Sequence, residues 1–124
     1  MLRFEGPSLS SEAVPLVLRL WAPVLLWAAV IFALSSLSDL GTGLGTWDLV
    51  LRKIAHAGEF AVLGALLLRA LREDVPALAL GIAYAATDEL HQHFVPGRVG
   101  SPLDVVIDAV GVAIGVTAWR RFRR

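Results

Sequence analysis

The sequence has no cysteine among its 124 residues, which excludes a disulfide framework, a thiolate metal site and a cysteine nucleophile. It also has little charge, since 18% of its residues are Asp, Glu, Lys or Arg, against about 25% in ordinary soluble domains. The 11 basic and 11 acidic residues cancel, which excludes a broadly basic nucleic-acid-binding protein. Apolar residues dominate instead, at 56% with a mean hydropathy of +0.69. A chain this short exposes much surface, so the excess indicates that lipid surrounds the protein.

Four apolar stretches are long enough to cross a membrane as helices, because about 20 residues cover a hydrocarbon core of about 30 Å. The predicted spans cover roughly residues 20–37, 54–71, 77–94 and 103–119. The first is longer than the apolar core of a signal peptide and follows Glu5 and Glu12, so we expect it to stay uncleaved. The sequence predicts an all-α fold in which residues 1–124 form one domain, an up-down bundle of four transmembrane helices.

The basic residues predict the orientation of this bundle in a bacterial plasma membrane. Lys and Arg are enriched in the cytoplasmic segments of membrane proteins. Eight basic residues flank the spans on one side: Arg3, Arg19, Arg69, Arg72, Arg120, Arg121, Arg123 and Arg124. Three lie on the other side: Arg52, Lys53 and Arg98. We therefore expect a multi-pass protein with both termini in the cytoplasm.

Polar residues of the last three spans gather at the outer end under this topology. A charged side chain at the middle of a membrane costs about 2.5–3.5 kcal/mol, so ionisable residues within spans are functional candidates. The candidate catalytic residues are His56, Glu59, Asp88, Glu89, Asp104 and Asp108. The candidate substrate-binding residues are Lys53, Gln92, Arg98 and Ser101. Carboxylates and imidazoles supply general acids and bases, and the basic residues can receive a phosphate or carboxylate.

Helical spacing predicts which way the acidic residues of the last span face. Asp104 and Asp108 share one face, which continues as Gly111 and Gly115. Two small residues four apart allow another helix backbone to approach closely. The acidic face is therefore expected to point into the bundle rather than towards lipid.

A divalent metal ion is a candidate cofactor, since carboxylate oxygens and imidazole nitrogens ligate such ions, although the spacing here matches no established metal motif. The candidate ligands are Asp104, Asp108, Glu89 and His91. Structural roles compete with these functional ones. Asp104 follows a suitable N-cap, Ser101, by three residues and could simply neutralise a helix N-terminus. His56 with Glu59 could form a buried pair that only locks two helices together.

At these same residues the chain resembles the VanZ-like membrane protein family. The resemblance covers roughly Arg52 to Gly115 and rests on RKIAHAGEFAVLGALL and YAATDELHQHFVPGRVGSPLDVVIDAVGVAIG. Two places depart from the pattern: Gly58–Glu59 stands where many relatives carry an aromatic or other polar residue, and Asp108 stands where many carry asparagine. The resemblance implies a small bacterial membrane protein related to one linked to resistance to teicoplanin, a lipoglycopeptide that acts on cell-wall precursors.

Two functions are therefore expected. In the first, an outward-facing polar, acidic pocket binds a lipid-linked or cell-envelope molecule and, in an enzymatic version, also modifies it. In the alternative, a non-catalytic accessory protein docks to an envelope enzyme or sequesters precursor or antibiotic. The expected partners are membrane lipids and a lipid-linked cell-wall precursor or glycopeptide antibiotic, and nucleic acid is not among them.

Overall fold

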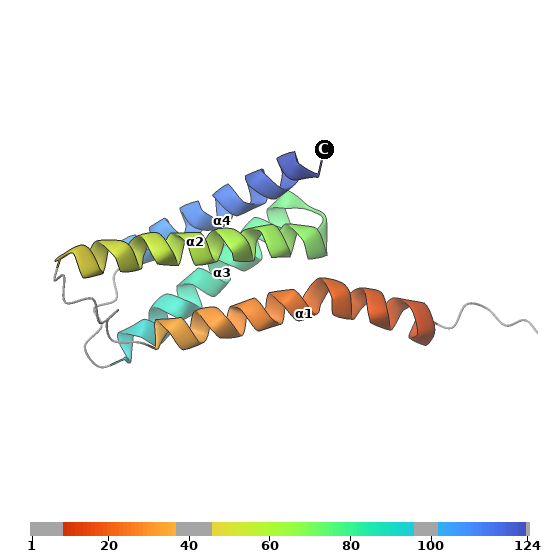
Figure 1. Ribbon diagram of the computed structural model, residues 1–124, viewed down its shortest axis with the longest axis horizontal. Coiled ribbons are helices and arrows are strands. Elements are labelled where there is room, and N and C mark those ends of the chain that lie inside the picture. Colours follow the sequence, from red (N-terminus) through yellow and green to blue (C-terminus); the bar gives the residue numbers. More distant parts are fainter. Residues whose placement is uncertain (1–8, 37–45, 96–101, 124) are drawn as a thin grey trace, which may run out of the picture.

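A computed structural model describes residues 9–36, 46–95 and 102–123. Its helices are α1 (Leu9–Ser35), α2 (Thr46–Leu71), α3 (Asp74–His93) and α4 (Pro102–Phe122), and the described residues contain no strand (Figure 1). The all-α prediction is confirmed. The helices extend beyond the predicted spans, most clearly at the beginning of α1 and α2. Asp48 lies in the first turn of α2 and pairs with Arg52 at 3.5 Å, an arrangement that stabilises this additional turn.

Three helices are long and apolar enough to cross a membrane, over Pro15–Ser35, Val50–Leu71 and Pro102–Phe122. The third predicted span, α3, is not among them, because polar residues in its second half, which include Asp88, Glu89, His91 and Gln92, lower its mean hydropathy. Large apolar side chains are exposed on the outside of the helices, for example Leu25 and Leu26 of α1. Extended apolar surface of this kind is typical of contact with a membrane.

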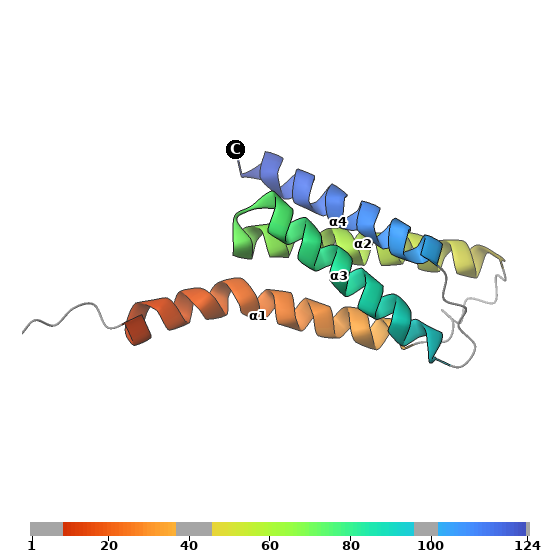
Figure 2. The same ribbon diagram turned by 180° about the vertical axis from the view of Figure 1, so that it is seen from behind.

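The two ends of the molecule differ in composition. The end of α1, the start of α2, the end of α3 and the start of α4 lie towards one end of the long axis, which we call the polar end (Figures 1 and 2). The α2–α3 connection and the end of α4 lie towards the other, the basic end. Arg120 of α4 pairs there with Asp74 of α3 at 2.7 Å. Further arginines belong to the same segments: Arg69 in the last turn of α2, Arg72 in the α2–α3 connection, Arg121 in the last turn of α4 and Arg123 directly after it.

The closest packing in the molecule joins α2 to α4, which run in the same direction (Figure 1). A Cβ atom added at Gly111 would meet the backbone of Ala57, and one at Gly115 would meet the backbone of Ala61. Gly64 of α2 lies in the same way against the backbone of Val112. The expectation that Gly111 and Gly115 allow close helix approach is confirmed, and small residues of α2 face them.

Apolar side chains complete the interior between the helices. Ile31 of α1 and Phe60 of α2 are fully buried, and so are Ala77 and Ala85 of α3 and Val112 of α4. Gly81 of α3 faces Val112, with Val112 Cγ1 only 2.6 Å from where a Cβ atom would stand. This core holds the inner faces of the helices at a fixed rotation and height, and those faces carry the polar residues described next.

Candidate functional site

Buried polar side chains from all four helices meet near the polar end. They are Ser35 of α1, His56 of α2, Asp88 and Gln92 of α3, and Asp108 of α4, which together we call the polar centre. Their exposed fractions are 0% for Ser35, 1% for Asp108, 3% for Asp88, 4% for Gln92 and 8% for His56. Burying polar groups is costly unless they are hydrogen-bonded to one another. The stability of this arrangement therefore depends on the contacts between the five side chains.

His56 lies at the middle of the polar centre and contacts the other four residues. Its Nδ1 is 3.1 Å from Asp108 Oδ1. Its Nε2 lies 2.9 Å from Gln92 Nε2, 3.3 Å from Ser35 Oγ and 3.6 Å from Asp88 Oδ2. An amide nitrogen only donates, so His56 Nε2 accepts from Gln92. The proton of a neutral imidazole then resides on Nδ1, which donates to the Asp108 carboxylate.

Gln92 extends this network to a second carboxylate. Its side-chain nitrogen donates to Asp88 Oδ2 at 2.9 Å, within one turn of α3. The two N–H groups of one amide thus bridge Asp88 and His56. The result is a chain in which Asp108, His56, Gln92 and Asp88 follow one another, and a chain of this kind holds each member in one orientation.

The helical repeat explains why these residues share the interior. His56 precedes Phe60 by four positions and Ser35 follows Ile31 by four, so each polar residue lies one turn from a fully buried apolar one. Asp108 stands in the same relation to buried Val112. The polar centre is therefore a continuation, towards the polar end, of the faces that form the apolar core.

Glu59 lies at the edge of the polar centre. One of its carboxylate oxygens is 3.9 Å from His56 Nε2, and its side chain is 13% exposed. Its backbone oxygen accepts a 2.8 Å hydrogen bond from the indole of Trp27. This bond fixes α1 against α2 one turn from His56.

Three members of the polar centre have the chemistry of metal ligands. Ligand-capable atoms of His56, Asp88 and Asp108 all lie within 4.8 Å of one another. Two carboxylates and one imidazole suit a divalent cation. Such an ion would compete for His56 with the hydrogen bonds described above. Among the described residues this is the one group with the spacing of metal ligands. Of the four candidate ligands predicted from the sequence, only Asp108 belongs to it.

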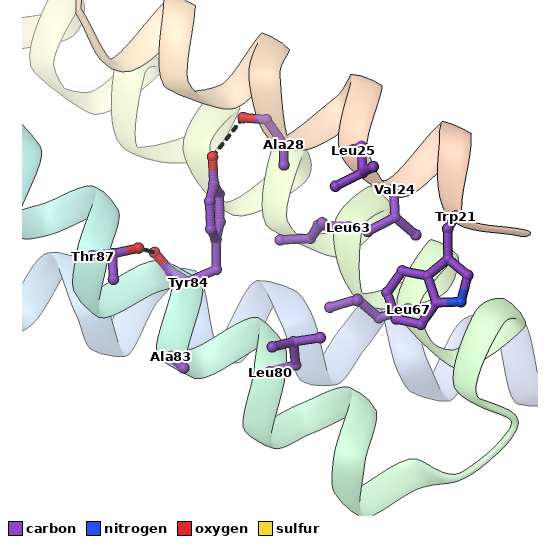
Figure 3. A pocket seen from close by; sticks show the side chains of 10 residues that line it. All are labelled: Trp21, Val24, Leu25, Ala28, Leu63, Leu67, Leu80, Ala83, Tyr84 and Thr87. Carbon is purple, nitrogen blue, oxygen red and sulfur yellow. Dashed lines mark hydrogen bonds between the residues drawn. The ribbon is translucent and has the colours of Figure 1, made fainter. Parts of the chain in front are cut away.

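An apolar slot of about 370 Å³ lies between α1, α2 and α3 (Figure 3). It is lined by Trp21, Val24, Leu25, Ala28, Leu63, Leu67, Leu80, Ala83, Tyr84 and Thr87. Leu25 and Leu80 are exposed, so the slot reaches the outside of the helices. In Figure 3 Tyr84 and Trp21 lie towards opposite ends of the slot, and the Tyr84 hydroxyl donates to the backbone oxygen of Ala28.

The slot and the polar centre follow one another along the same helix faces. On α2, Leu67 and Leu63 line the slot, Phe60 follows, and His56 comes next towards the polar end. The Phe60 ring lies between them, with its centroid 5.7 Å from that of His56 and 6.0 Å from that of Tyr84. About 10 Å of helix separates Leu63 from His56. The molecule thus places a closed polar site beside an open apolar one.

Comparison with known proteins identifies the family. A VanZ/LLP1 family model matches residues 18–123, which is nearly the whole chain. The chain belongs to the VanZ/LLP1 family. Among curated proteins and solved structures the searches found no match. The match to VanZ/LLP1 confirms the resemblance seen in the sequence and extends it beyond residues 52–115, so that most of α1, with Ser35 and the α1 side of the slot, belongs to the family domain as well.

The structure of this VanZ/LLP1 chain brings some predicted site residues together and separates others. His56, Asp88, Gln92 and Asp108 meet in the polar centre. Lys53 and Asp104 instead pair with each other at 2.6 Å and are partly exposed. Glu89 is half-buried on α3, next to Asp88 in sequence. Arg98 and Ser101 lie outside the described residues.

His91, a candidate metal ligand, lies apart from the polar centre. Its Nε2 is 3.0 Å from the hydroxyl of exposed Ser36, and its ring stacks on Phe32 with centroids 4.1 Å apart. It therefore joins the ends of α1 and α3 at the surface. The buried group at this position of the fold is the neighbouring serine, Ser35, which the sequence interpretation did not single out.

The signal for Ser35 is present in the sequence but weak. Val24, Ala28, Ile31 and Ser35 follow the three-and-four spacing of a single helix face. A serine at the end of an apolar helix is most often a surface residue, and Ser36 beside it is one. Only the packing of α1 against His56 distinguishes the two.

Proposed function

We propose that this VanZ/LLP1 protein crosses the bacterial plasma membrane four times, with both termini in the cytoplasm and the polar end outside. The arginines collected at the basic end support this orientation. We include α3 as the fourth span although polar groups lower its hydropathy. Two of these groups, Asp88 and Gln92, are buried against other helices, so they would not face lipid.

In this orientation the protein binds a lipid-linked or lipid-anchored molecule of the cell envelope. One observation carries the proposal: an apolar slot and a buried polar centre lie in series along the same helix faces. An amphiphile has the matching order, with a hydrocarbon chain that suits the slot and a polar group that suits the centre. A ligand without a long hydrocarbon chain would leave the slot unfilled.

The depth of the polar centre fits the polar part of such a molecule. His56 is six residues inside the span that begins at Val50, which corresponds to about 9 Å along the helix. The slot lies deeper, at the level of Leu63 and Leu67. A lipid of the outer leaflet that entered between α1 and α3 would direct its head towards His56 and its chain along the slot. The resemblance to proteins linked to teicoplanin resistance supports an envelope molecule as ligand.

Filling the slot is expected to weaken lipid binding. The large indole of Ala83→Trp would occupy space that a chain needs, and we expect about tenfold weaker retention of phosphatidylglycerol, equivalent to about 1.4 kcal/mol. Native mass spectrometry of the detergent-purified protein, titrated with this lipid, measures the retention.

The matched control is Ala86→Trp, which adds the same side chain at an exposed position of α3 that does not line the slot. It is expected to bind lipid as the unmodified protein does. Equal retention by all three proteins would show that the slot is not the binding site. Lipid that is bound and recovered unchanged would favour the accessory role over a modifying one.

A further inference from the structure

Three residues of the polar centre have the order and spacing of a serine nucleophile with its base. Ser35 Oγ is 3.3 Å from His56 Nε2, and His56 Nδ1 is 3.1 Å from Asp108 Oδ1. Each residue comes from a different helix: α1, α2 and α4. In serine hydrolases of unrelated fold, the hydroxyl, the imidazole and the carboxylate stand in this order, and the geometry rather than the sequence order defines the arrangement.

We infer that Ser35 is a nucleophile, that His56 is its general base and that Asp108 positions His56. The substrate class is a carboxylic ester of a membrane amphiphile, and the reaction is acyl transfer to Ser35 followed by hydrolysis. This inference rests on the proposed function, since the apolar slot holds the chain that leads to the ester. It assigns to the polar centre a reaction in addition to binding.

The reaction needs no reagent other than the ester and water. As Ser35 Oγ bonds to the carbonyl carbon, its proton passes to His56 Nε2. The tetrahedral intermediate then breaks the bond to the alcohol oxygen, which takes that proton and leaves. A water molecule attacks the acyl-serine, and its proton passes to His56 and then to Ser35 Oγ as the carboxylic acid departs. Asp108 stays ionised and stabilises the imidazolium in both halves.

Two residues of α3 complete the surroundings of the nucleophile. The side-chain nitrogen of Gln92 is 3.4 Å from Ser35 Oγ, so its N–H groups lie where they can donate to the carbonyl oxygen as it becomes negative. To do so Gln92 turns away from His56 Nε2, which frees that nitrogen for the serine proton. Asp88, 3.6 Å from the same nitrogen, favours the protonated imidazole.

The neighbouring pair at the surface explains why the inference concerns Ser35 and not Ser36. Ser36 and His91 are 3.0 Å apart, closer than Ser35 and His56. Among the described residues His91 contacts Ser36 and Phe32 but no carboxylate, and the Ser36 hydroxyl donates to the backbone oxygen of Phe32 at 3.0 Å. The exposed pair therefore lacks a carboxylate that would hold the imidazole ring in one orientation. For this reason Ser36 serves as the matched control for Ser35.

The first experiment uses a lipophilic fluorophosphonate on the full-length protein in detergent, with the adduct located by peptide mass spectrometry. The expected adduct is on Ser35, so Ser35→Ala should form no adduct at that position. His56→Asn should label at least about 100-fold more slowly, the range that a general base contributes. Ser36→Ala should label normally. Asp108→Asn should lose labelling and Asp108→Glu should recover part of it, as expected for a positioning residue. Absence of an adduct on Ser35, or its persistence in His56→Asn, would overturn the inference.

Labelling should be unaffected by excess EDTA. A requirement for added divalent cation would overturn the inference, because an ion held by His56, Asp88 and Asp108 would occupy the base.

A second experiment guards against variants that fail to fold. Because the chain has no cysteine, Ser35→Cys and Ser36→Cys each carry one thiol. N-ethylmaleimide should modify the thiol of Ser35→Cys faster than the thiol of the double variant Ser35→Cys with His56→Asn. The rate at which it modifies Ser36→Cys should be the same with and without His56→Asn.

The two proposals fail separately. If Ala83→Trp leaves lipid retention unchanged while Ser35 is still labelled, the proposed lipid binding in the slot is wrong and the assignment of Ser35 as a nucleophile stands. If lipid retention depends on the slot and Ser35 does not label, the binding function remains and the nucleophile is wrong.

Discussion

Gly115→Leu is expected to destabilise the folded protein more than any other single substitution considered for this chain. A Cβ atom at position 115 would overlap the backbone oxygen of Ala61 on α2. Backbone cannot turn aside as a side-chain end can, so α2 and α4 would have to separate. Overpacking by single methylene groups already costs typically about 1–3 kcal/mol, and an isobutyl group at a backbone contact exceeds that range. In membranes the close approach of small residues is itself a main source of helix association.

The measurement is a thermal or denaturant unfolding midpoint of the purified protein in one detergent, for the series Gly115→Ala, Gly115→Val and Gly115→Leu. Stability should fall with each added carbon. Gly58→Leu is the control on the same pair of helices, because nothing lies within 4 Å of a Cβ atom added there. Equal midpoints for Gly58→Leu and Gly115→Leu would contradict the contact between α2 and α4.

The same contact determines the geometry of the polar centre. Ala57, next to His56 in α2, lies against Gly111, which is three residues after Asp108 in α4. Because the two helices run in the same direction, the contacts follow one another in register: Lys53 with Asp104, His56 with Asp108, Ala57 with Gly111 and Ala61 with Gly115. The small residues thus bring the imidazole and its carboxylate to hydrogen-bonding distance.

The sequence was sufficient for the helices and for the face on which each residue lies. Apolar runs predict all four helices, and the spacing of Asp108, Gly111 and Gly115 correctly predicts that this face of α4 is turned inwards. A repeat of 3.6 residues depends on one helix alone, so a single sequence is enough to predict it. The family was likewise recognisable from motifs in the last three helices.

The pairing between helices was not predictable in this way, because it depends on their relative rotation and height. Asp104 and Asp108 share a face and have the same side chain, yet Asp104 meets Lys53 near the surface and Asp108 meets His56 in the interior. One turn of α4 separates these two outcomes. The same reason explains why Ser36 and His91 remain at the surface while Ser35 joins the polar centre. Both serines are uncharged residues at the same helix end, so the sequence alone does not indicate which of the two is buried.

Asp108→Leu is expected to be the most damaging single substitution within the polar centre. Asp108 is 1% exposed, and His56 is the partner of its carboxylate. Its removal leaves the Nδ1–H of a buried imidazole without an acceptor in a medium that supplies none. Breaking a buried charge-assisted pair on one side costs about 3–5 kcal/mol. The unfolding midpoint in detergent should fall accordingly, by an amount close to that of Gly115→Leu.

The double variant His56→Leu with Asp108→Leu should regain most of this loss. Replacing both partners of a buried polar pair by apolar side chains of similar size is often neutral or stabilising, because no unsatisfied group remains. Fluorophosphonate labelling of Ser35 should nevertheless be lost in the single and in the double variant. A double variant no more stable than Asp108→Leu would mean that the pair serves mainly to hold the helices together. Recovery of stability without recovery of labelling would instead show that the fold does not need this imidazole and carboxylate, and that the chain carries them into the membrane for their chemistry.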